Sequence, residues 1–257
     1  MKRFEAVLGG KVAVVVGGTS GIGRSIALAF AREGATVVAS SRLEEGVVRT
    51  AEEIEALGGR SLRMASDVTD RESLVRLRDG VVAEFGRVDV LVNSAGITRK
   101  LPTLDCPEEV WLDIMNVNLT GTLRACQVFG ASMLERGSGR IINIASMSTF
   151  VAFHEVAAYG ASKAAVGALT RSLAVEWAPY GVMVNAIAPG IFPTALNSEI
   201  LKTERGRELI LRTPIGRFGE LDELSGAAIY LASDYASYTT GQIVVVDGGQ
   251  LASGVNQ

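Results

Sequence analysis

Short apolar runs that stop at glycine recur along this chain and constrain its fold more than any other feature. The first, residues 12–16, is Val-Ala-Val-Val-Val, and Gly17 and Gly18 follow it directly. A short β-branched run that ends at glycine is typical of a strand buried on both faces. Similar runs occupy residues 36–41, 61–66, 88–92, 140–145, 182–187 and 242–246. Together they predict a sheet of about seven strands.

Segments with helical spacing separate these strands. They cover residues 22–33, 44–57, 70–85, 107–136, 156–178 and 220–231, and a polar stretch over 191–217 precedes the last of them. Alternating strands and helices predict a parallel sheet with helices on both faces. We therefore expect one doubly wound α/β domain over residues 1–257, with ligands beyond the carboxyl ends of its strands.

Composition excludes several classes of protein. The chain is 48% hydrophobic with a net charge of −3, which favours a folded core and gives no basic footprint for nucleic acid. No apolar stretch reaches the roughly 18 residues of a membrane span, and the start of the chain lacks a signal-peptide core. Two cysteines, Cys106 and Cys126, suit reduced thiols rather than a disulfide framework. These features predict a cytoplasmic protein that binds no membrane.

A glycine-rich turn follows the first predicted strand. Gly17, Gly21 and Gly23 have the spacing G-x-x-x-G-x-G, which allows a tight turn and lets a pyrophosphate approach the next helix. Such a motif alone is weak, but this one follows a strand and opens a helix near the N-terminus. It predicts a dinucleotide site.

The end of the second predicted strand bears on which nicotinamide cofactor binds. An acidic residue there would bind the ribose hydroxyls of NAD, whereas an arginine accommodates the 2′-phosphate of NADP. The chain has Ser41 and Arg42, with no acid before Glu44. We expect NADP(H) to be preferred over NAD(H), although Arg42 could instead be a solvated residue at the start of a helix.

Tyr159 and Lys163 are four residues apart, so they are neighbours on one face of a helix. A phenol with a pKa near 10 is a poor acid or base at neutral pH, and a nearby ammonium together with a positively charged nicotinamide ring should lower that pKa. This pair alone is a common pattern. Ser146 strengthens it, because the serine ends a predicted strand 13 residues before the tyrosine and could hydrogen-bond a substrate carbonyl.

Together these motifs resemble those of the short-chain dehydrogenase/reductase family, in its form of roughly 250 residues. The resemblance covers essentially the whole chain and implies a Rossmann fold. The resemblance implies catalytic roles for Asn118, Ser146, Tyr159 and Lys163. The cofactor-binding residues that it implies are Gly17, Thr19, Ser20, Gly21, Ile22, Gly23, Ser41, Arg42, Asp67, Val68, Asn93, Ala95, Gly96, Tyr159, Lys163, Pro189, Gly190 and Thr194. Two positions depart from the family pattern, Val16 for a threonine and Ser94 for an asparagine.

The resemblance also implies a mechanism that interconverts a ketone and a secondary alcohol. Hydride would pass from the nicotinamide to the carbonyl carbon while Tyr159 donates a proton to the oxygen. Lys163 would hold the ribose and lower the pKa of the tyrosine, Asn118 would hold a water that relays protons, and Ser146 would fix the substrate oxygen. No metal is required.

The substrate is harder to predict. The chain resembles the gluconate 5-dehydrogenase and 2-deoxygluconate dehydrogenase members of the family, and Arg99 and Lys100 could clamp a sugar-acid carboxylate. The same loop could equally be solvated or lie at a subunit contact. It also fits a 3-oxoacyl-[acyl-carrier-protein] reductase, which would share Gly-Ile-Thr-Arg. His154 could touch substrate or be an ordinary surface histidine, and a lid over 191–212 would set specificity.

Two further expectations follow from the resemblance. The family usually forms homotetramers through its two long helices and its last strand, so we expect a homotetramer here. A non-catalytic NADP-binding scaffold would keep the fold without turnover, but the intact catalytic positions speak against that alternative.

Overall fold

The computed structural model describes residues 6–195, 197 and 201–253 of the chain. Its sheet has six parallel strands in the order β2-β1-β3-β4-β5-β6. The strands are β1 (Val12–Val16), β2 (Thr36–Ser40), β3 (Val90–Asn93), β4 (Gly139–Ile144), β5 (Val182–Pro189) and β6 (Ile243–Val246). The order reverses between β1 and β3, and such a switch point opens a crevice at the carboxyl ends of the strands.

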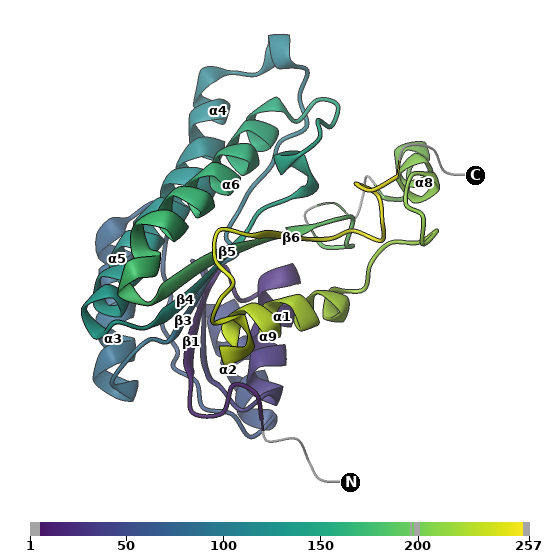
Figure 1. Cartoon of the computed structure of the whole chain (residues 1–257). Coiled ribbons are helices and arrows are strands. Elements are labelled where there is room, and N and C mark those ends of the chain that lie inside the picture. The colour runs from purple at the N-terminus through teal and green to yellow at the C-terminus, as the bar shows by residue number, and fades with distance from the viewer. Residues whose placement is uncertain (1–5, 196, 198–200, 254–257) are drawn as a thin grey trace, which may run out of the picture.

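Helices cover both faces of this sheet (Figure 1). On one face lie α1 (Gly21–Arg32), α2 (Glu44–Ala56) and α9 (Ser225–Ala232). On the other lie α3 (Arg71–Phe85), α4 (Glu108–Met115), α5 (Gly121–Arg136) and α6 (Ala157–Trp177). The helix α8 (Glu204–Leu211) stands apart from both layers, beyond the end of β6 (Figure 1). The predicted doubly wound α/β fold is therefore confirmed.

Alternate side chains of the buried strands build a separate core on each face. Val15 and Phe30 belong to the core beneath α1 and α9, whereas Val14, Phe129 and Trp177 belong to the core beneath α3, α5 and α6. All five residues of β1 are buried, as expected for a strand covered on both sides. This rigid centre fixes the strand ends from which the functional groups project.

The seventh strand predicted at residues 61–66 is not formed in the described chain. The segment runs beside β2, where Val37 donates to the Arg60 carbonyl and Ser66 donates to the Ser41 carbonyl. Between these two bonds the Ser40 hydroxyl donates to the Met64 carbonyl. The segment is thus extended but lacks a regular ladder, and the sheet has six strands.

The long helix predicted at 107–136 is interrupted. A π-helical turn, Asn116–Thr120, joins α4 to α5. Such wide turns insert an extra residue into a helix and are frequent at functional sites. Here the turn contains Asn118, which the sequence analysis placed among the catalytic residues.

The predicted lid over 191–212 contains α8, and its residues 196 and 198–200 lie outside the described chain. In the part of the chain that is described, no helix is both long and apolar enough to span a membrane. Both cysteines are free thiols, with Cys126 buried.

Candidate active site

A cavity of about 540 Å³ opens at the switch point of the sheet. The turn after β1, the ends of β4 and β5, and the start of α6 enclose it. Its lining residues are Gly17, Ser20, Gly21, Ile22, Ser41, Arg42, Ser94, Ala95, Gly96, Ile144, Ala145, Ser146, Tyr159, Lys163, Pro189, Gly190, Phe192, Thr194, Ala195 and Asn197. The fold therefore brings Ser146, Tyr159 and Lys163 into one space with most of the predicted cofactor residues.

The glycine turn fits a pyrophosphate because its backbone leaves no room for side chains. Gly17 has φ of +78°, and a Cβ there would lie 2.7 Å from the backbone carbonyl carbon of Ser94. A Cβ on Gly23 would clash with the carbonyl oxygen of Gly17. Ser20 precedes α1 without capping it through its side chain, so the first amides of the helix face the cavity. These features suit a dinucleotide phosphate.

The part of the cavity beside β2 contains a cation and hydroxyls. Ser41 and Arg42 both line it, and the Thr19 hydroxyl donates to the Ser41 hydroxyl at 2.7 Å. Arg42 is exposed, and no aspartate or glutamate occurs among the described lining residues. A guanidinium in such a place can bind a phosphate through two parallel hydrogen bonds.

Lys163 is almost completely buried at the floor of the cavity. Its Nζ donates to the Ile144 carbonyl at 2.7 Å and lies 5.8 Å from the centre of the Tyr159 ring. Burial disfavours the charged amine and lowers the pKa of Lys163 to about 8. The amine is still mostly protonated at neutral pH.

The phenol of Tyr159 has a raised pKa. Burial is the main cause, and a hydrogen bond with Ser146 opposes it in part. The phenol is therefore protonated at neutral pH and can act as a proton donor. The expected lowering by Lys163 together with a positively charged nicotinamide ring concerns the enzyme with cofactor bound, and it stays a prediction.

Asn118 lies behind the cavity rather than in its lining. Its Oδ1 accepts from the Ile97 amide at 2.8 Å, and its Nδ2 donates to the Ile97 carbonyl at 3.0 Å and to the Ser162 hydroxyl at 3.0 Å. The Ser162 hydroxyl donates in turn to the Tyr159 carbonyl. The side chain of Asn118 thus ties the loop after β3 to the helix that bears the tyrosine.

A buried polar chain that sequence reasoning missed crosses the sheet next to this site. Asn93 Nδ2 donates to Asn143 Oδ1 at 2.9 Å, and Asn143 Nδ2 donates to the Thr170 hydroxyl at 3.0 Å. It links the neighbouring strands β3 and β4 to α6. An asparagine within the apolar run 140–145 is the signal that could have revealed it.

Five of the predicted cofactor residues do not line the cavity: Thr19, Gly23, Asp67, Val68 and Asn93. Thr19 donates to the Ser41 hydroxyl, Gly23 packs against the Gly17 carbonyl, and Asn93 belongs to the buried polar chain. The carboxylate of Asp67 accepts from the amide and hydroxyl of Thr69, both at 2.8 Å.

The basic pair Arg99–Lys100 does not line the cavity either. Lys100 forms an ion pair with Glu155 at 3.1 Å, and the Leu101 amide donates to the Glu155 carbonyl at 2.8 Å. The hydrogen bond from Lys100 is the main reason why the pKa of Glu155 is lowered. Lys100 thus joins two loops, and Arg99 is exposed.

No group of three or more histidine, cysteine, aspartate or glutamate side chains that could hold a metal occurs within the described residues. The cavity instead combines a dinucleotide-type glycine turn with a serine, a tyrosine and a lysine. That combination defines a nicotinamide-dependent oxidoreductase acting on CH–OH groups.

Comparison with known proteins makes the assignment specific. A family model described as enoyl-(acyl carrier protein) reductase matches residues 16–250. The chain belongs to the short-chain dehydrogenase/reductase family.

Three characterised relatives differ in what their names say they act on. The chain is 42% identical over 246 residues to D-threitol dehydrogenase of Mycolicibacterium smegmatis, covering 96% of this chain and 95% of that protein. It is 39% identical to 3-oxoacyl-[acyl-carrier-protein] reductase of Thermotoga maritima, covering 94% and 98%. It is 40% identical to 2-dehydro-3-deoxy-D-gluconate 5-dehydrogenase of Dickeya dadantii, covering 95% and 97%.

Solved structures agree with this family. A protein from Beutenbergia cavernae, described as a "putative NAD(P) dependent gluconate 5-dehydrogenase" with NADP bound at low occupancy, has a TM-score of 0.92 and 45% identity. That comparison covers 97% of this chain and 100% of the other. A gluconate 5-dehydrogenase from Burkholderia cenocepacia in complex with NADP and tartrate has a TM-score of 0.93 and 36% identity, covering 97% and 98%.

Proposed function

We propose that this enzyme interconverts a keto-sugar acid and the corresponding hydroxy acid with NADP(H). One observation supports this most directly: Ser146, Tyr159 and Lys163 line the same cavity as the glycine turn and Arg42. A single domain, residues 1–257, would supply both the cofactor site and the lid over 191–212.

In the reducing direction, Tyr159 is the general acid. The nicotinamide cofactor, when bound, supplies the hydride. Ser146 hydrogen-bonds the carbonyl oxygen and holds it beside the phenol, which donates its proton to that oxygen as negative charge develops there. Lys163 adds a positive charge close to the phenol and can hydrogen-bond a ribose hydroxyl in the same cavity.

Asn118 acts as a positioning residue in this proposal. The side chain of Asn118 hydrogen-bonds Ile97 and Ser162, and its backbone carbonyl accepts from the Thr122 hydroxyl at 2.7 Å. These contacts suit a role in holding the loop at Gly96 and the first turn of α6. A water molecule that relays protons between Asn118 and Lys163 would have to donate to the backbone carbonyl of Asn118, which already accepts from the Thr122 hydroxyl.

The preference for NADP(H) is supported by Arg42, by the small Ser41 beside it, and by an acid-free lining. The remaining cofactor contacts would come from Ser20 and Ile22 at the start of α1, from Ala95 and Gly96 after β3, and from 189–194.

The sugar-acid substrate is supported by the relatives named for gluconate and ketogluconate chemistry. A second candidate, reduction of 3-oxoacyl thioesters, is favoured by the similarity to the Thermotoga maritima reductase. A non-catalytic scaffold is a third and less favoured candidate, because the serine, tyrosine and lysine are all in place.

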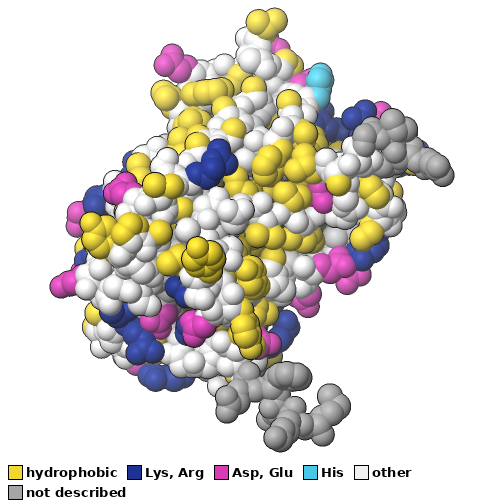
Figure 2. All heavy atoms as spheres, in the orientation of Figure 1, with side chains coloured by type: hydrophobic (Ala, Val, Ile, Leu, Met, Phe, Trp, Pro, Cys, Tyr) yellow, Lys and Arg dark blue, Asp and Glu magenta, His cyan; other side chains and the backbone are white. Residues whose placement is uncertain are grey.

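A homotetramer is part of the same proposal. Trp111 and Leu112 on α4 expose large apolar side chains, and β6 is an edge strand with half-buried residues. On the face shown in Figure 2, hydrophobic side chains gather near the middle and charged ones lie mostly toward the rim. A monomeric mass in light scattering would contradict this part of the proposal.

The test is NADPH and NADH oxidation against a panel of carbonyl compounds. The panel contains 5-ketogluconate, 2-keto-3-deoxygluconate, an acetoacetyl thioester and simple ketones. We expect an NADPH-dependent rate on the keto-sugar acids that exceeds the others. A preference for the thioester would favour the acyl reductase, and cofactor binding without any rate would favour the scaffold.

A further inference from the structure

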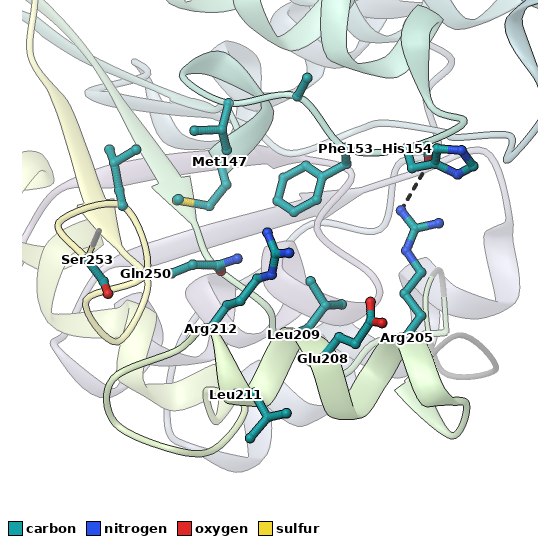
Figure 3. A pocket seen from close by; sticks show the side chains of 13 residues that line it. Met147, Phe153, His154, Arg205, Glu208, Leu209, Leu211, Arg212, Gln250 and Ser253 are labelled. Atoms are coloured by element: carbon teal, nitrogen blue, oxygen red, sulfur yellow. Dashed lines mark hydrogen bonds between the residues drawn. The ribbon is translucent and has the colours of Figure 1, made fainter. Parts of the chain in front are cut away.

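A second cavity, of about 740 Å³, lies under the lid helix α8 (Figure 3). We call it the lid cavity. It is enclosed by the loop after β4, by α8 and by the segment after β6. Its lining residues are Met147, Val151, Ala152, Phe153, His154, Arg205, Glu208, Leu209, Leu211, Arg212, Gln250, Leu251 and Ser253.

The lid cavity begins where the catalytic cavity ends. Ser146 lines the catalytic cavity and the next residue, Met147, lines the lid cavity. A short 3₁₀ turn, Met147–Thr149, fixes this junction, because the Ser146 hydroxyl accepts from the Ser148 amide at 3.1 Å. The two cavities are thus lined by consecutive residues, and a substrate that uses both must reach from Ser146 to the lid cavity.

Arg212 supplies an uncommitted cation to this space. Its side chain has no ion pair and no hydrogen bond to any described residue, whereas Arg205 donates to the His154 carbonyl at 3.0 Å. Figure 3 shows the Arg212 guanidinium directed from the end of α8 into the cavity, toward Phe153. The described lining holds two arginines and one glutamate, so its charge favours an anion.

Gln250 supplies a second polar side chain to this space. It lies beside Arg212, and Figure 3 shows its amide nitrogen on the side of Arg212. The Oε1 atom is buried and out of reach of a ligand, so the amide nitrogen is the group that can donate to a bound anion.

We propose that the lid cavity binds the carboxylate end of the substrate, with Arg212 as the carboxylate-binding residue and the Gln250 amide nitrogen as a second donor. This inference rests on the proposed sugar-acid function. In 5-ketogluconate the carboxylate lies several carbon atoms from the keto carbon, so it needs a partner beyond Ser146. A planar guanidinium can bind it through two hydrogen bonds. Arg212 would then bind the substrate carboxylate, the role suggested from the sequence for Arg99 and Lys100.

The test compares 5-ketogluconate with L-sorbose, in which a hydroxymethyl group replaces the carboxylate. Arg212→Gln should lower kcat/KM for 5-ketogluconate by about 10- to 100-fold, the loss expected for one charged hydrogen-bonding partner. The rate on L-sorbose should change by less than about threefold by the same reasoning. Arg212→Lys should recover part of the loss. Arg207→Gln is the matched control, because Arg207 lies on the same helix, pairs with Glu204 and does not line the cavity.

A second measurement separates this inference from the proposed function. Calorimetric titration with tartrate, a non-reacting dicarboxylate probe, should show binding that Arg212→Gln weakens about tenfold. Two results would overturn the role of Arg212 even if 5-ketogluconate is reduced. One is an equal loss of kcat/KM on 5-ketogluconate and L-sorbose, and the other is a tartrate affinity that is the same in Arg212→Gln and the wild type. If the wild type reduces no keto-sugar acid but binds tartrate through Arg212, the anion site stands and the proposed function falls.

Discussion

Replacing Lys163 by methionine should change how stability depends on pH. The wild-type amine is buried, and its pKa is lowered from 10.5 to about 8. Between about pH 8 and pH 10.5, therefore, Lys163 is protonated in the unfolded chain but largely deprotonated in the folded chain. Stability must rise with pH across that window, because the unfolded state binds more protons there.

The size of the effect follows from the lowered pKa. A displacement from 10.5 to about 8 corresponds to about 3 kcal/mol, and about 2 kcal/mol of it should be recovered between pH 8 and pH 10. Lys163→Met removes this titration. It also removes the hydrogen bond to the Ile144 carbonyl, worth about 1.5–3 kcal/mol, so the two proteins should be close in stability near neutral pH.

The assay is denaturant unfolding of both proteins at pH 7, 8, 9 and 10, with turnover measured in parallel. The wild type should gain stability relative to Lys163→Met as the pH rises, and the variant should be inactive at every pH. Lys100→Met is the control, since it removes an exposed ammonium that is paired with Glu155. A stability difference that stays constant from pH 8 to pH 10 would refute the reasoning.

Three other substitutions test the site. Tyr159→Phe should keep cofactor affinity but lower turnover by at least about 100-fold, because only the transferable proton is lost; survival of a tenth of the rate would contradict the acid role. Arg42→Ala should raise the KM for NADPH about tenfold or more and leave NADH nearly unchanged, with Arg49→Ala on α2 as the control; equal effects on both cofactors would remove Arg42 from this role. Gly17→Ala should weaken NADPH binding in a fluorescence titration and lower the unfolding free energy by more than about 2 kcal/mol. Gly10→Ala has a similar positive φ but open space around it, so it should cost only about 1 kcal/mol, and equal costs would refute the clash.

The sequence predicted the fold well where a single local rule decides the structure. The strand 12–16, the glycine turn and the helix after it were each expected, and the structure has β1 and α1 there. Parallel strands place their carboxyl ends at one edge, so Ser146 could be expected beside the glycine turn although 123 residues separate it from Gly23. The i, i+4 spacing likewise predicted that Tyr159 and Lys163 are neighbours on one face of a helix.

The parts that sequence missed depend on contacts between distant segments. Segment 61–66 contacts β2 through side-chain as well as backbone hydrogen bonds, such as that from the Ser40 hydroxyl to the Met64 carbonyl, and the sequence of the segment does not reveal this pairing. The pairing of Lys100 with Glu155 needs two loops to meet, and neither loop has a periodic pattern. The burial of the Tyr159 phenol, which raises its pKa, also depends on packing that the spacing to Lys163 does not reveal.

The π-helical turn at Asn116–Thr120 also sets the rotational phase of the helices that it joins. One extra residue in a helix turns everything before it by about 100° relative to everything after it. Because the wide turn absorbs this offset, α5 can bury Phe129 and Met133 in the core while α4 directs Trp111 and Leu112 outward. Straightening this turn while keeping every residue would bring the outward face of α4 around by about 100°, whereas deleting one residue would regularise the helix and leave both faces where they are. The wide turn thus keeps α4 and α5 in phase while it accommodates a surplus residue at Asn118.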